Sequence, residues 1–381
     1  MALCGFLNKF ITTNSFKIKP MRKIFLQLLI LSMGINLMAQ KETKTENIIL
    51  VTIDGFRWQE LFNGADSSFL HNKKLVENTG KYTKRYWNDN LSERREMLLP
   101  FIWGTVAAQG QVYGNRAKGC FVNVKNPFWF SYPGYNEILT GFADKRINSN
   151  EFGPNPNTGV FEMMNESDAF KGRIATFASW DAFNDILNEK RSGLLVNSGF
   201  ENVEGLDSDN KINVLNDIQT GLPDIFDGVR LDAVTFNMGF EYLKEKSPRI
   251  LYLAFDETDD FAHGGRYNDY LNSAHNADDF LKKLWSWVQQ DPAYKDKTTL
   301  MITCDHGRGE GSVGWRSHGG ETAHSDQTWF AVIGPDTPAT GEISSGQYYN
   351  NQYAKTLAAL LGFDYVTENP VGSVIDSVFG K

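Results

Sequence analysis

Several apolar runs of this chain are followed by Asp or His residues, whose side chains bind metal ions in proteins. These residues are Asp54, Asp259, His263, Asp305, His306 and His318. A lone carboxylate at the end of a buried strand is costly to bury, and a cation offsets that cost. Ser131, between Phe130 and Tyr132, adds a hydroxyl group. Metal ligands together with a positioned hydroxyl indicate hydrolysis through a metal-activated serine.

The spacing of two pairs strengthens this interpretation. Asp259 and His263 are four residues apart, so a helical turn would place both on one face. Other carboxylates of the same turn could replace Asp259 as the ligand, namely Asp256, Glu257 and Asp260. Asp305 and His306 can both reach one ion only where the chain turns after a strand, and Gly307 permits such a turn.

Two of the candidates also fit a simpler role. A hydroxyl at the start of a helix is most often an N-cap, and Ser131 precedes a segment that reads as helical as far as Leu139. The same location favours an alkoxide and offers backbone N–H groups to a phosphate. His318 competes with His324 for one metal position, and the other histidine of this loop is expected to be merely exposed.

Alternating apolar runs and amphipathic segments predict an α/β fold with a mostly parallel central sheet and helices on both faces. Strands are expected over 47–54, 172–178, 249–256, 298–304 and 328–333, and helices over 232–246, 271–290 and 353–361. Segments near 60–125 and 190–230 fit the alternation poorly and are interpreted as insertions that cover or flank the site. In such a sheet the ligands would gather beyond the carboxyl ends of the strands.

The first 40 residues are interpreted as an N-terminal extension and a signal peptide, because a basic start at Met21 precedes an apolar run and a small residue at Ala39. The rest, 41–381, is expected to form a single catalytic domain that is exported to the periplasm or secreted, with no membrane span in the mature chain. The net charge of −8 argues against binding of nucleic-acid polymers. A small anionic substrate remains compatible with it, since metal ions can dominate the local field.

Taken together, these motifs resemble the alkaline phosphatase superfamily, and most of all its branch of type I phosphodiesterases and nucleotide pyrophosphatases. The resemblance runs from about Asn47 to Pro335. It implies two divalent metal ions, with zinc as the metal expected. One ion would be held by Asp54, Ser131, Asp305 and His306, and the other by Asp259, His263 and His318. His318 is preferred to His324 because His318-Gly319 and the later Gly334-Pro335 keep the family's spacing.

The resemblance further implies a phosphomonoesterase or phosphodiesterase that acts on a small phosphate ester through a phosphoseryl intermediate on Ser131. The residues that would bind the phosphoryl oxygens are harder to place, and Asn148, Asn150 and Arg308 are the candidates, although Arg308 also fits an exposed loop arginine. Gly134 stands where the diesterases have Asn, which leaves the choice between monoesters and diesters open.

Three alternatives remain beside this interpretation. A sulfatase would need Arg where the chain has Tyr135, four residues after the serine. A phosphomutase shares the metal pattern but fits an exported protein poorly. A non-catalytic binding protein could retain the fold, although the intact ligand set and Ser131 argue against it.

Overall fold

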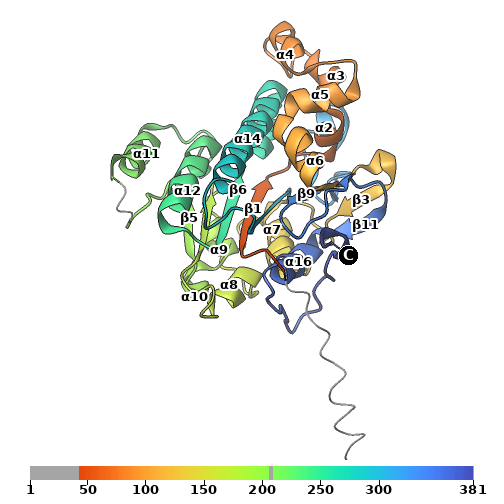
Figure 1. The fold of residues 1–381 in the computed structure, drawn as a ribbon. Coiled ribbons are helices and arrows are strands. Elements are labelled where there is room, and N and C mark those ends of the chain that lie inside the picture. The colour runs from red at the N-terminus through yellow and green to blue at the C-terminus, as the bar shows by residue number, and fades with distance from the viewer. Residues whose placement is uncertain (1–42, 206–208, 381) are drawn as a thin grey trace, which may run out of the picture. The chain divides into compact units, whose positions relative to one another are not determined.

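The computed structural model describes residues 43–205 and 209–380. In this part of the chain eight strands form a central sheet in the order β10-β2-β9-β7-β1-β6-β4-β5 (Figure 1). Their bounds are β1 (Asn47–Ile53), β2 (Gln111–Tyr113), β4 (Ile174–Ala178), β5 (Leu195–Ser198), β6 (Ile250–Phe255), β7 (Thr298–Thr303), β9 (Phe330–Ile333) and β10 (Gly341–Glu342). The expected signal segment lies outside the described residues.

The middle of the sheet is parallel. Strand β1 lies between β6 and β7, and Thr52 is in register with Ala254 on one side and Thr303 on the other. Strands β4 and β5 extend the parallel part, whereas β9 runs antiparallel to both β7 and β2. The expectation of an α/β fold with a mostly parallel sheet is therefore confirmed. The carboxyl ends of β1, β6 and β7 meet at one edge of the sheet.

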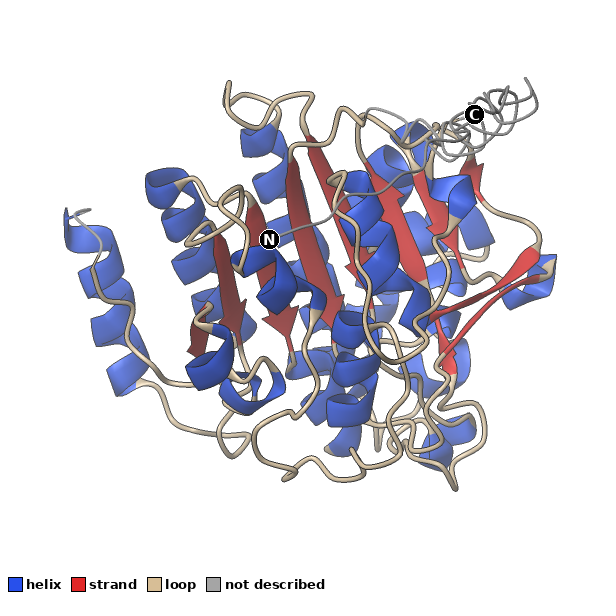
Figure 2. Cartoon of the chain, turned by 90° about the horizontal axis from the view of Figure 1, so that it is seen from below, coloured by secondary structure: helices blue, strands red, loops and turns tan. Residues whose placement is uncertain are grey.

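Helices cover both faces of the sheet, and in Figure 2 they lie in front of and behind the strands. Alternate residues of β1 point to opposite faces, so Ile49 and Val51 join one apolar core and Ile48 and Leu50 join the other. The first core is covered by α2 (Trp58–Asn63), α3 (Ser67–Leu70), α4 (Thr79–Tyr86), α5 (Leu91–Leu98), α12 (Asp232–Lys246) and α14 (Tyr267–Val288). The second is covered by α7 (Ser131–Thr140), α8 (Val160–Asn165), α9 (Phe183–Ile186) and α16 (Tyr353–Leu360).

The remaining described α-helices are short or lie at the edges of the fold. They are α6 (Ala107–Gln109), α10 (Glu189–Ser192), α11 (Asp209–Gly221), α13 (Glu257–His263) and α15 (Gly311–Gly314). None of the helices in the described ranges is long and apolar enough to cross a membrane.

Three segments differ from the sequence-based expectation. The segment near 60–125 is more than a cover, because β2 enters the central sheet and β3 (Cys120–Asn123) forms a second sheet. The run at 328–333 is divided between two sheets. Its first residue, Thr328, belongs to β8 (Gln327–Thr328), which pairs with β3, and its last four residues form β9, with Trp329 between the two strands. Strand β11 (Gly346–Tyr349) completes the second sheet.

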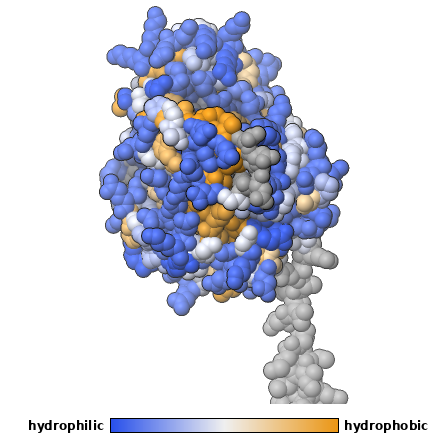
Figure 3. Space-filling view, turned by 90° about the vertical axis from the view of Figure 1, so that its left-hand side faces the viewer, coloured by the Kyte–Doolittle hydropathy of each residue, from blue (hydrophilic) through white to orange (hydrophobic). Residues whose placement is uncertain are grey.

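The segment near 190–230 contributes the edge strand β5 and helix α11. Exposed apolar side chains occur on both and on the loop that follows, at Leu195, Val214, Ile218 and Ile225. Figure 3 views the protein from the side on which α11 lies in Figure 1 and shows apolar surface between hydrophilic areas. The end of this segment, from 222 to 229, returns to the sheet edge where the candidate ligands lie.

Candidate active site

Three parallel strands deliver the candidate ligands to one place. Asp54 directly follows β1, and Asp305 and His306 follow β7. Asp259 and His263 lie on α13, the helix that begins two residues after β6 ends. Because these strands run in the same direction and in register, residues that leave their ends come together although they are far apart in the sequence.

The first group consists of Asp54, Asp305 and His306, all of which are buried. His306 Nε2 lies 3.3 Å from Asp54 Oδ1 and 3.4 Å from Asp305 Oδ2. The other ring nitrogen, Nδ1, donates to the carbonyl oxygen of Gly307 at 2.8 Å, which fixes the orientation of the ring. Asp54 Oδ1 and Asp305 Oδ2 accept no hydrogen bond from the described residues.

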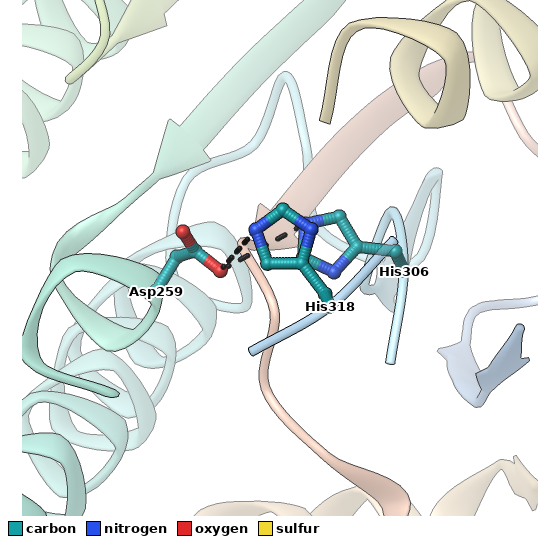
Figure 4. A group of neighbouring side chains, drawn as sticks. All are labelled: Asp259, His306 and His318. Carbon is teal, nitrogen blue, oxygen red and sulfur yellow. Dashed lines mark ion pairs between the residues drawn. The ribbon is translucent and has the colours of Figure 1, made fainter. Parts of the chain in front are cut away.

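The second group consists of Asp259, His306 and His318 (Figure 4). Asp259 Oδ1 lies 3.6 Å from His318 Nε2 and 3.8 Å from His306 Nε2, and the two rings are stacked with their centroids 4.0 Å apart. His263 lies beside this group, because its Nε2 is 3.0 Å from Asp259 Oδ2 and 2.9 Å from His318 Nε2. The structure thus brings together the six predicted Asp and His ligands.

The electrostatics of the first group fit a cation. Burial lowers the pKa of His306, but the carboxylates of Asp305 and Asp54 more than offset it and raise that pKa to about 9. Burial and the charge of Asp54 hold the pKa of Asp305 well above its usual range. A proton on His306 Nε2 therefore offsets the negative charge at Asp54 Oδ1 and Asp305 Oδ2, which accept no hydrogen bond from other described residues. Deprotonated imidazole and paired carboxylates are the donor set that binds divalent metals.

Ser131 is the first residue of α7 and faces these groups. Its Oγ lies 3.3 Å from His306 Nε2, and the residue is 6% exposed. Phe130 is the N-cap residue of α7, without a side-chain capping bond, so the Ser131 hydroxyl does not cap the helix. A cavity of about 310 Å³ opens above it, lined by Ser131 and by residues of both halves of the chain.

The structure corrects the interpretation of Arg308 as an exposed loop arginine. Arg308 is 1% exposed, and its Nη1 donates to Asp259 Oδ1. Its other nitrogens donate to the carbonyl oxygens of Trp315 at 2.7 Å and Arg316 at 2.8 Å. Burial acts to raise the pKa of Asp259, but Arg308, His318 and His263 together outweigh it and hold that pKa well below its usual range. Arg308 thus ties Asp259 to the loop that carries His318, and it is not among the residues that line the cavity.

The two candidate asparagines are placed differently. Asn150 lines the cavity, and its Oδ1 accepts from the backbone N–H of Tyr132 at 3.0 Å in the first turn of α7. This bond leaves the amide nitrogen of Asn150 free of partners among the described residues, so it can donate to a ligand. Asn148 is exposed and is not one of the residues that line the cavity.

Sequence reasoning missed one contact of this region, because Tyr135, one turn after Ser131, donates its hydroxyl to Asp54 Oδ2 at 2.7 Å. Two of the three named alternatives to Asp259, Asp256 and Asp260, line the cavity beside it. The third, Glu257, does not line the cavity and accepts from the backbone N–H of Asp232 and the hydroxyl of Ser273. The crowding of carboxylates after β6 was the available signal, but only the helical turn of α13 shows that they share one cavity.

The structure separates His318 from His324. His324 Nδ1 accepts from Gln327 at 2.8 Å, and its Nε2 faces Glu310 at 3.8 Å, away from both groups. We expect His318→Ala to lower the zinc affinity of the protein by at least about 10-fold, because loss of even a hydrogen-bond partner of a metal ligand typically costs that much. His324→Ala should bind zinc like the wild type. Isothermal titration calorimetry on both variants checks this, and an equal effect of the two substitutions would contradict it.

Glu137 holds the loop that leads into Ser131. It is fully buried on α7 and accepts from the backbone N–H groups of Lys125 at 2.7 Å and Asn126 at 2.8 Å. Asn126 in turn accepts from the N–H groups of Phe128 and Trp129, both at 3.0 Å. Burial raises the pKa of Glu137 to about 7, and the N–H donors offset this only in part.

We expect Glu137→Gln to change how stability depends on pH. Because the folded pKa is above the ordinary value, the stability that proton uptake contributes is complete below about pH 4.5 and is lost as pH rises through about 7. The wild type should therefore lose unfolding free energy across this window relative to the Gln variant, whose side chain does not titrate. Urea denaturation at several pH values measures this. Glu151→Gln, at an exposed site, is the control and should keep the wild-type slope.

A comparison with protein families decides the relationship of the chain. The sequence profile of the Sulfatase family matches residues 138–363, which is more than half of the chain. The chain belongs to the Sulfatase family. The matched range includes the second group of Asp and His residues and the Asp305-His306 pair, but it begins after Ser131. A search of curated protein sequences finds no match.

Solved structures of an alkaline phosphatase, a phosphodiesterase and a putative sulfatase share the fold of this Sulfatase-family protein. The alkaline phosphatase PafA is 11% identical with a TM-score of 0.55, over 89% of this chain and 99% of that one. Murine ectonucleotide pyrophosphatase/phosphodiesterase 5 is 13% identical with a TM-score of 0.53, over 88% and 100%. A putative sulfatase from Bacteroides thetaiotaomicron is 12% identical with a TM-score of 0.55, over 88% and 74%. Membership of the Sulfatase family indicates a hydrolase that acts on ester groups.

Proposed function

We propose that the protein is an exported, metal-dependent phosphate-ester hydrolase whose nucleophile is Ser131. The observation that carries this proposal is the position of Ser131 Oγ, which begins α7, makes no capping bond and lies 3.3 Å from His306 Nε2. A hydroxyl at this point faces buried carboxylates and imidazoles on one side and an open cavity on the other. Export is proposed from the basic and apolar segment that starts at Met21.

The two groups of Asp and His residues would each hold one divalent ion, for which zinc suits the nitrogen and oxygen donors. Asp54, Asp305, His306 and Ser131 would hold one, and Asp259, His263 and His318 the other. Bound ions would supply the positive charge that lowers the pKa of the serine hydroxyl and stabilises the departing oxygen.

The residues of the chain then account for both steps. Ser131 Oγ loses its proton and bonds to phosphorus as the bond between phosphorus and the alcohol oxygen breaks, and the alcohol leaves with a proton. Water then adds to phosphorus, the bond to Oγ breaks and Oγ regains a proton, so the net reaction is hydrolysis. The N-terminus of α7 favours the negative charge on Oγ, and the Asn150 amide can donate to a phosphoryl oxygen.

Sulfate-ester hydrolysis is the second candidate, because the family match favours it. Tyr135 argues for phosphate. It stands where the sulfatase motif would need Arg, and its hydroxyl is committed to Asp54 Oδ2.

An assay on the purified protein tests the proposal. We expect zinc-loaded protein to hydrolyse p-nitrophenyl phosphate or bis-p-nitrophenyl phosphate, to lose this activity in excess chelator and to recover it when zinc is returned. The ratio of the two rates distinguishes monoesterase from diesterase. Turnover of p-nitrophenyl sulfate alone would establish the second candidate instead. No turnover of any of the three by metal-loaded protein would overturn both.

A further inference from the structure

The cavity above Ser131 has an apolar wall that the 190–230 segment helps to build. Trp180, Phe226 and Val229 line it, and Trp180 and Val229 are joined by an antiparallel β-bridge. The ring of Phe226 packs edge-on against Phe261 of α13, with centroids 5.0 Å apart. Two aromatic rings therefore stand beside the place that the alcohol part of an ester would occupy. At about 310 Å³ the cavity has the size of a small-molecule site.

The same cavity is lined by more carboxylates than the candidate metal ligands account for. Asp227, Asp256 and Asp260 line it, and none of the three forms an ion pair with a Lys or Arg of the described residues. No Lys or Arg of that part of the chain lines the cavity. Arg308, the nearest cation of the site, is committed to Asp259. A phosphate ester without positive charge would leave the carboxylate of Asp227 without a cationic partner in the cavity.

Asp256 adds an independent observation. It is 7% exposed and lines the cavity, yet no donor of the described residues reaches its carboxylate other than the carboxyl group of Asp260. Buried carboxylates normally have hydrogen-bond or ionic partners. A further carboxylate, Asp181, follows Trp180 in the chain. Burial raises the pKa of Asp181, and the nearby charges of Asp224 and Asp227 raise it further. Asp181 and Asp224 do not line the cavity, but they add acidic groups beside Asp227, which does.

We propose that the natural substrate is a phosphate ester of an amino alcohol, whose ammonium group binds between the rings of Trp180 and Phe226 and the carboxylate of Asp227. This inference rests on the proposed phosphate-ester hydrolysis at Ser131. Aromatic faces and carboxylates are the two groups that attract an organic ammonium ion, and here they share one wall. The cation also balances the negative charge that the phosphoryl group brings to an acidic cavity.

A matched pair of substrates tests the proposal directly. Choline phosphate and 3,3-dimethylbutyl phosphate have the same shape and differ in the charge of one atom. We expect zinc-loaded protein to prefer choline phosphate by about 10-fold in kcat/KM, the range of a cation–aromatic contact with a carboxylate nearby. Free choline should inhibit the enzyme more strongly than 3,3-dimethylbutanol.

Two substitutions localise the effect. Asp227→Asn and Phe226→Ala should each bring the preference for choline phosphate toward one. Asp217→Asn, at an exposed residue of α11 outside the cavity, should leave the preference unchanged. Equal rates on the two esters together with turnover of p-nitrophenyl phosphate would overturn this inference and leave the proposed function standing. No turnover of any phosphate ester would overturn both.

Discussion

Ser131→Ala is expected to lower kcat on phosphate esters by at least about 10³-fold, as removal of a nucleophile does in other hydrolases. The expected loss is large because Ser131 Oγ is the hydroxyl that faces both groups of Asp and His residues from the floor of the cavity. Zinc binding should persist through the carboxylates and imidazoles that remain. Steady-state kinetics, with metal content measured on the same sample, checks both parts.

Ser131→Thr is the matched control for this experiment. It keeps a hydroxyl at the first position of α7, so a substantial part of the turnover should remain. Mass spectrometry of protein quenched during turnover should find a phosphate on Ser131 in the wild type. If the Ala variant kept wild-type turnover with its metal bound, water would be the nucleophile and the proposed role of Ser131 would be wrong.

The apolar runs made the fold and the gathering of the candidate ligands predictable. Strands buried on both faces appear as uninterrupted Ile, Leu and Val, and Asn47–Ile53 and Ile250–Phe255 lie where such runs were expected. A chain that alternates these runs with amphipathic helices forms a parallel sheet, so polar residues after its strands meet at one edge. That rule brought Asp54, Asp259 and Asp305 together without knowledge of any contact.

Contacts between distant segments were not predictable in the same way. Arg308 appeared to be an exposed loop residue, because nothing in its neighbourhood shows that its partners are Asp259 and the carbonyl groups at 315–316. Strand β2 is only three residues long and joins the central sheet by pairing with β9. Its residues carry too short a pattern to distinguish a strand from a loop. The residues of 222–229 that line the cavity were likewise not predictable, because the sequence does not show where the long segment near 190–230 returns to the sheet.

Gly55→Ala is expected to disable the site although glycine contributes no chemical group to it. Gly55 follows Asp54 with a φ of +56°, and a Cβ atom there would lie 2.5 Å from Asp259 Oδ1 and 2.9 Å from Arg308 Nη1. The imidazole of His306 would be 3.2 Å away. Asp259 lies on α13, whereas His306 and Arg308 follow β7, and all three side chains are buried. A side chain that moved away from the new Cβ atom would also move away from the other two. We therefore expect loss of zinc binding at the second group and of nearly all turnover.

The strain of the backbone alone must be separated from this displacement. Gly172 has a φ of +69°, and a Cβ atom there would meet nothing within 4 Å, so Gly172→Ala adds only the cost of a left-handed residue, about 1–2 kcal/mol. Gly172→Ala should lose that much unfolding free energy in urea and Gly55→Ala at least that much, whereas only Gly55→Ala should lose zinc and activity. Wild-type zinc affinity in Gly55→Ala would show that Asp259 and Arg308 can move apart without loss of function. The close packing of three chain segments around Gly55 would then not be what positions the candidate ligands.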